Sequence, residues 1–108
     1  MKDIKIWSLW VSEFKEKIKE DYIIIDVRTF MEVQQWRLEC MDMIIDCYLS
    51  DFTIKIDKLD RNKKYLLYCR SGSRTWMTLN LMKDLWFKEV YDLWWWIINW
   101  LNEWEKLI

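Results

Sequence analysis

The stretch YLLYCRSGSRT, residues 65–75, decides the fold and marks the first place to search for a site. Its apolar run, which ends at Cys69, is typical of a strand that is buried on both faces of a parallel sheet. Helical spacing follows from Thr75 to about Leu85, so a short polar loop joins the strand to a helix. A second buried run, YIIIDV at 22–27, also predicts a strand. Ligands of parallel sheets gather where strands end and helices begin, which directs attention to these two strand ends.

The rest of the chain alternates short apolar runs with helical periodicity. Further strands are expected at 4–6, 44–45 and 90–93, and helices at 11–18, 31–35, 50–59 and 95–104. Strands that alternate with helices of this length predict an α/β fold with a parallel sheet. Two details are also predicted: Ser8 or Ser12 caps the first helix, and a stripe on the helix over 75–85 faces the core. That stripe consists of Met77, Leu81 and Leu85.

Length and charge exclude several classes of protein. The 108 residues suit one domain, 1–108, and leave no room for a second. A net charge of −1 provides no global field for nucleic acid or an anionic membrane, so neither is expected as a partner. No apolar run approaches the roughly 18 residues that a membrane-spanning helix requires. Charges interrupt the first ten residues, MKDIKIWSLW, which argues against a secretory signal and for a cytoplasmic protein.

The composition is unusual. Ala, Pro and His are absent, glycine occurs once, and tryptophan occurs ten times. Without histidine the chain has no imidazole base, no imidazole metal ligand and no Ser-His-Asp triad. The bias is typical of a designed or heavily substituted sequence.

Three cysteines, Cys40, Cys47 and Cys69, cannot all pair, so reduced thiols of a cytosolic protein are expected. The spacing of Cys40 and Cys47, with six residues between them, does not suit zinc in a chain without histidine, and no metal is expected. Both are predicted to be buried, inert thiols. Cys69 has different surroundings, because it ends a strand directly before a polar loop.

The loop after Cys69 can form an anion cradle. Its backbone N–H groups can curl around one point, and the helix N-terminus adds about half a positive charge there. Residues 61–75 hold five basic residues and no acidic one, which draws an anionic substrate to this spot. A thiol at such a focus is favoured as the thiolate. The candidate binding residues are Arg70, Ser71, Gly72, Ser73, Arg74 and Thr75.

These residues resemble a known family. The stretch 65–75 is similar to the active loop of the single-domain rhodaneses, which are sulfurtransferases. IIDVRT at 24–29 resembles the family's Asp-Val-Arg strand end, and FKEVYDL at 87–93 resembles its closing strand. The resemblance extends over about residues 4–104. It implies one rhodanese-like α/β domain with a parallel sheet of about five strands and helices on both faces.

The resemblance also implies a chemistry. The family forms a persulfide on its loop cysteine, here Cys69, from a sulfane sulfur donor such as thiosulfate. The outer sulfur then passes to cyanide or a thiol acceptor. Arg74 is expected to help hold the anionic donor, and Asp26 and Arg28 to support the site through ion pairs. No cofactor is implied.

Two other functions stay open. A cysteine-dependent phosphatase of related fold separates its Cys and Arg by five residues, whereas four separate Cys69 from Arg74 and make a smaller cradle. A catalytically silent scaffold or interaction domain would keep the fold and the loop.

Tryptophan replaces glycines that the family uses at tight turns, and we expect strain at these sites. Exposed tryptophans would also favour self-association. The replaced positions are Trp36, Trp86, Trp95 and Trp96.

Overall fold

The computed structural model describes residues 4–70 and 73–93. Strands and helices alternate along this part of the chain, in the order β1 (Lys5–Leu9), α1 (Val11–Ile18), β2 (Ile23–Asp26), α2 (Phe30–Gln35), β3 (Met43–Ile44), α3 (Phe52–Asp57), β4 (Lys64–Tyr68), α4 (Ser73–Asp84) and β5 (Glu89–Leu93). The helix predicted at 95–104, with Trp95 and Trp96, lies outside the described residues, as do Ser71 and Gly72.

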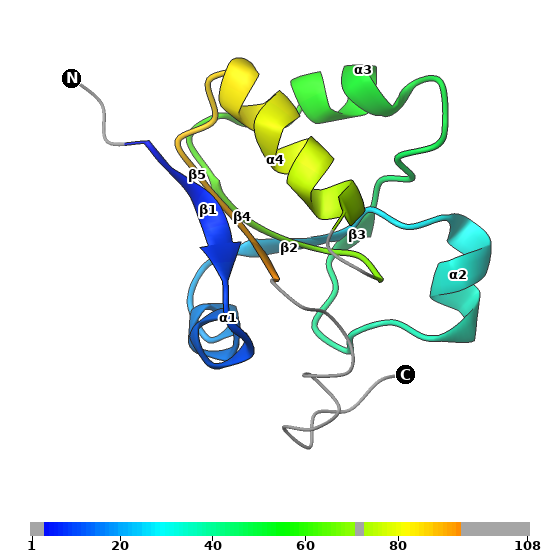
Figure 1. Ribbon diagram of the computed structural model, residues 1–108, viewed down its shortest axis with the longest axis horizontal. Coiled ribbons are helices and arrows are strands. Elements are labelled where there is room, and N and C mark those ends of the chain that lie inside the picture. The colour runs from blue at the N-terminus through cyan, green and yellow to red at the C-terminus, as the bar shows by residue number, and fades with distance from the viewer. Residues whose placement is uncertain (1–3, 71–72, 94–108) are drawn as a thin grey trace.

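The five strands form one parallel sheet in the order β1-β5-β4-β2-β3 (Figure 1). This confirms the predicted α/β class. The apolar runs of β2 and β4 are buried because both strands lie inside the sheet. β4 lies between β5 and β2, and β2 lies between β4 and β3. Asp26 pairs in register with Tyr68, so β2 and β4 end at the same edge of the sheet. The two strand ends that the sequence singled out are therefore neighbours.

Helices flank both faces of the sheet, as predicted. One apolar cluster joins α3 and α4 to the sheet through Phe52, Ile56, Leu79 and Met82. A second cluster, on the other face, packs Val11 and Phe14 of α1 under the strands. Figure 1 shows α3 and α4 on one side of the sheet and α1 on the other. Two separate cores thus fix the strands from above and below.

The predicted cap of α1 is wrong. Ser8 belongs to β1 and Ser12 lies inside α1, so the N-cap position is taken by Trp10. The reason is that β1 continues to pair with β5 through Leu9, which prevents the helix from beginning earlier.

The predicted buried face of α4 is only partly confirmed. Leu81 and Leu85 are partly buried and pack against the core, but Met77 is 49% exposed. The face that packs on the sheet holds two threonines beside two apolar residues: Thr75, Thr78, Leu79 and Met82. Buried threonines are stable here because their hydroxyls donate hydrogen bonds, Thr75 to Asp92 and Thr78 to the Arg74 carbonyl. An apolar pattern alone does not reveal such a face.

One tryptophan, at the C-terminal end of α4, has a strained backbone conformation. Trp86 has φ 67°, in the left-handed region, and its N–H donates to the Lys83 carbonyl while that of Phe87 donates to the Met82 carbonyl. This pair of bonds is a Schellman motif, in which glycine normally takes the left-handed position. Trp36, by contrast, has φ −164°, which any residue adopts, so no strain arises there. The strain expected from lost glycines is present at Trp86 and absent at Trp36.

Replacing Trp86 by glycine is expected to stabilise the fold by about 1 kcal/mol, because a side chain in the left-handed region costs about 1–2 kcal/mol. The indole is 76% exposed, so little buried surface is lost. Urea denaturation measures the difference. Trp76→Gly is the matched control, since this tryptophan is also exposed but lies inside α4, where glycine destabilises. A Trp86→Gly variant that is no more stable than the parent contradicts the strain.

Candidate functional site

Cys69 lies directly after β4, between the strand and the N-terminus of α4 at Ser73. Its side chain is only 4% exposed. Arg70 and Ser73 flank it with exposed side chains, whereas the predicted binding residues Ser71 and Gly72 lie outside the described part of the chain. The position places the thiol at the electropositive end of a twelve-residue helix. Such a place favours a thiolate or another anion.

A chain of buried polar atoms runs inward from the thiol. Cys69 Sγ lies 3.8 Å from Thr75 Oγ1, and the Thr75 hydroxyl donates to Asp92 Oδ2 at 2.7 Å. Burial raises the pKa of the Asp92 carboxyl, while hydrogen bonds from Ser8 and Thr75 partly lower it. Sequence reasoning included Thr75 but missed Asp92. The signal that could have identified Asp92 is its position as an acidic residue within the apolar strand VYDL at 90–93.

The guanidinium of Arg74 faces α2. Its Nη1 and Nη2 donate to the two carboxylate oxygens of Glu32 at 2.6 and 2.9 Å. Hydrogen bonds from Arg74 and Thr29 lower the pKa of Glu32 to about 2, against the opposing effect of burial. Glu32 also accepts from the Thr29 backbone as part of the capping box of α2. The charge that was predicted to hold an anionic donor is thus also engaged with a carboxylate, which sequence reasoning missed.

Asp26 and Arg28, which were expected to support the site through ion pairs, form a completely buried ion pair with each other. Arg28 Nη2 lies 2.7 Å from Asp26 Oδ2 and donates to the Trp36 carbonyl, also at 2.7 Å. The ring of Trp36 covers the guanidinium at 3.6 Å from its centroid. These contacts tie the end of β2 to both ends of α2, because Arg28 precedes the helix and Trp36 follows it. Their role in the chemistry remains a prediction.

The other two cysteines are half-buried rather than buried. Cys40 packs at the margin of the α1 face, where the segment after α2 returns to the sheet. Cys47 lies next to β2, since its N–H donates to the Val27 carbonyl at 3.3 Å. Burial raises the pKa of the Cys47 thiol, and the charge of Arg74 opposes this effect. Cys40 lies before β3 and Cys47 after it, both outside the strands and helices.

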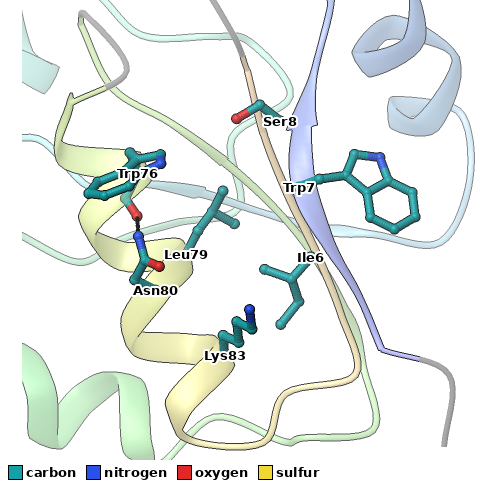
Figure 2. A pocket seen from close by; sticks show the side chains of 7 residues that line it. All are labelled: Ile6, Trp7, Ser8, Trp76, Leu79, Asn80 and Lys83. Carbon is teal, nitrogen blue, oxygen red and sulfur yellow. Dashed lines mark hydrogen bonds between the residues drawn. The ribbon is translucent and has the colours of Figure 1, made fainter.

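A concavity of about 260 Å³ lies apart from Cys69, between β1 and α4. Figure 2 shows Ile6 and Trp7 leaving β1 on opposite sides, and Asn80 bonded to the Trp76 carbonyl. The residues that line this concavity are Ile6, Trp7, Ser8, Trp76, Leu79, Asn80 and Lys83. Within residues 4–70 and 73–93 no helix could span a membrane, and no three Cys, Asp or Glu residues come together as a metal site.

Comparisons with known proteins agree with this geometry. The model of the Rhodanese-like domain family matches residues 11–103. A protein of Bacillus subtilis (strain 168), named "Putative sulfurtransferase YtwF", is 29% identical over 89 residues, which cover 81% of this chain and 84% of that protein.

Solved structures are similar as well. A rhodanese-related protein from Thermoplasma volcanium has a TM-score of 0.77 at 25% identity, over 94% of this chain and 96% of its own. The 30 kDa polysulfide-sulfur transferase homodimer from Wolinella succinogenes has a TM-score of 0.74 at 19% identity, over 95% of this chain and 78% of its own. The second likeness concerns the fold alone.

The ion pair of Glu32 with Arg74 predicts a dependence of stability on pH. The pKa of Glu32 is lower in the folded chain than its ordinary value of 4.5, so the pair stabilises above that pH and loses its effect as pH falls toward 2. Glu32→Gln should therefore cost about 2 kcal/mol near neutral pH and almost nothing near pH 2.

Denaturant titrations of parent and variant across this pH range measure the difference. Glu16→Gln is the control, because Glu16 pairs with Lys19 while both side chains are 72% exposed. Equal stability of the parent and Glu32→Gln at all pH values contradicts the ion pair's contribution.

Proposed function

Because the chain belongs to the Rhodanese-like domain family, we propose that it is a sulfurtransferase that works through a persulfide on Cys69. The donor is thiosulfate or a similar small anion with a sulfane sulfur, and the acceptor is cyanide or a thiol. The observation that carries the proposal is the position of Cys69, a buried thiol between the end of β4 and the N-terminus of α4. Residues 1–108 form one domain in this proposal.

The reaction has two displacements at sulfur. The Cys69 thiolate attacks the outer sulfur of thiosulfate, the S–S bond of the donor breaks, and sulfite leaves with the bonding electron pair. The cyanide carbon then attacks the outer sulfur of the persulfide. The bond between this sulfur and Cys69 Sγ breaks, thiocyanate leaves, and the thiolate returns. Neither step needs an electron donor, a metal or an organic cofactor.

Each charged residue has a part in this proposal. The N-terminus of α4 stabilises the thiolate and the persulfide, and the exposed Arg70 attracts the donor. Arg74 binds the donor from its place beside Cys69 while Glu32 holds its guanidinium. Asp26 and Arg28 support the segment that carries Glu32. Thiols without disulfides suit the reducing cytoplasm, where we place the protein.

A catalytically silent scaffold is the second candidate, and one observation favours it. Arg74 gives both of its terminal nitrogens to Glu32, so its charge is partly neutralised toward a donor. The exposed tryptophans of the described chain would serve self-association in that case; they are Trp7, Trp10, Trp76 and Trp86. A phosphatase fits less well, because the loop has four residues between Cys69 and Arg74.

Cys69→Ser is expected to abolish thiocyanate formation from thiosulfate and cyanide, since the hydroxyl cannot carry the persulfide. Cys40→Ser and Cys47→Ser should keep most of the rate, because neither thiol lies in the loop that joins β4 to α4. A colorimetric thiocyanate assay on the folded variants decides the matter. An inactive parent would favour the silent scaffold, and loss of activity in Cys47→Ser would move the chemistry to another thiol.

Arg74→Ala should raise the KM for thiosulfate about tenfold with a smaller change in kcat, as expected for loss of a charge-assisted contact made in both ground and transition states. Arg74→Lys should restore part of the loss, because a point charge replaces a planar fork. Glu32→Gln separates binding from positioning. If Arg74 only anchors α2, Glu32→Gln will reproduce the kinetics of Arg74→Ala; if Arg74 binds the donor, Glu32→Gln will raise KM less than Arg74→Ala does.

A further inference from the structure

We propose that Thr75 and Asp92 form a proton relay that converts the Cys69 thiol into the thiolate. The inference rests on the proposed function and deepens it, since it names the group that receives the thiol proton. The proton of Cys69 passes to Thr75 Oγ1 while Thr75 passes its own proton to Asp92 Oδ2. The S–H bond breaks and an O–H bond forms on Thr75; the original Thr75 O–H bond breaks and one forms on Asp92. The negative charge moves from the carboxylate to the sulfur.

The contacts have the direction that this transfer requires. The thiol of Cys69 donates to Thr75 Oγ1 at 3.8 Å, and the same hydroxyl donates to Asp92 Oδ2 at 2.7 Å. A hydroxyl can accept and donate at once, which makes threonine a suitable intermediary. After the transfer, Thr75 donates its hydrogen to the thiolate and accepts one from the neutral Asp92. The Cys69 sulfur, Thr75 Oγ1 and Asp92 Oδ2 therefore each keep a hydrogen-bond partner in both states.

Burial favours transfer of the proton from Cys69 through Thr75 to Asp92 over transfer to bulk water. Cys69 is 4% exposed, Thr75 0% and Asp92 2%. Bulk water therefore has little access to the two inner groups, and a carboxylate is the strongest base that the thiol can reach through them. The sequence contains no histidine, the residue that serves most often as a general base near neutral pH. Three elements, β4, α4 and β5, bring the relay together in their packing.

The carboxylate of Asp92 is held in a place that favours its protonation. Among residues 4–70 and 73–93, no group hydrogen-bonds its Oδ1. Burial raises the pKa of this carboxyl, and Ser8 of β1 and Thr75 of α4 are the side chains that oppose the effect. Protonation removes a poorly satisfied buried charge. The charge then lies on sulfur, next to the N-terminus of α4, where it is stabilised.

The pH profile of Cys69 alkylation by iodoacetamide tests the relay, measured in a Cys40→Ser, Cys47→Ser background so that one thiol reports. Thr75→Val keeps the shape but removes the hydroxyl, and Asp92→Asn keeps a bond to Thr75 but cannot take the proton. In the parent, transfer within the relay yields thiolate without releasing a proton to water, so the alkylation rate should keep a pH-independent part below the midpoint of the profile. Each variant should lose that part, and its rate should then fall about tenfold for each pH unit below the midpoint. Thr75→Ser should restore the parent profile.

Two comparisons separate a relay from a structural role. The double variant Thr75→Val, Asp92→Asn should lose no more of the pH-independent rate than either single variant, because both act through one relay. A parent without a pH-independent rate, or a rate of this kind that persists in folded Thr75→Val and Asp92→Asn, overturns the proposal. Should Asp92→Asn fail to fold, the contrast between Thr75→Val and Thr75→Ser still decides, and equal profiles of that pair overturn it.

The readout is independent of sulfur transfer. Alkylation needs only the thiolate, so the relay can be established in a chain that produces no thiocyanate, and an active sulfurtransferase can lack the relay. A parent that is active but shows no pH-independent alkylation rate would refute the relay alone. A parent that is inactive, and whose pH-independent rate is lost in both variants, would refute the sulfurtransferase alone.

Discussion

Parallel pairing of β4 between β2 and β5 is the constraint on which the rest of the structure depends. Because parallel strands end at one edge of a sheet, the register of Asp26 with Tyr68 and of Leu67 with Asp92 brings three strand ends together. Each end carries polar chemistry in an otherwise apolar run. The buried thiol of Cys69 acquires its neighbours from this pairing, since nothing in the order of the chain places Asp92 beside it.

Two ion pairs lie at this edge of the sheet. Asp26 and Arg28 are fully buried, and Arg74 and Glu32 are partly so, with 13% and 28% of their side chains exposed. Removing one member of a buried pair costs about 3–5 kcal/mol, because it leaves the other charge without compensation. Both pairs link α2 to the rest of the site. Asp92 differs from them, since its buried carboxylate has hydroxyl partners instead of a cation.

Much of the fold can be predicted from the sequence, and the features that could not be predicted have physical causes. The apolar runs of β2 and β4 predict buried parallel strands, because only such strands lack a polar face. The spacing of apolar residues gave only part of the buried face of α4, because Thr75 and Thr78 are also buried there and make hydrogen bonds that a hydropathy pattern does not record. Glu32 and Asp92 were missed for a related reason. Their importance comes from partners 42 and 17 residues away, which the fold alone brings near.

The proposed chemistry depends on the Cys69 sulfur as the atom that carries the transferred sulfur. Mass spectrometry of the intact protein and of its peptides, after incubation with thiosulfate and removal of excess donor, tests this most directly. The expected result is a gain of about 32 Da, one sulfur atom, confined to the peptide that contains Cys69 and reversed by cyanide. The reversal distinguishes a persulfide from the oxidised forms of cysteine. An unmodified Cys69, or the same gain on Cys40 or Cys47, would contradict it.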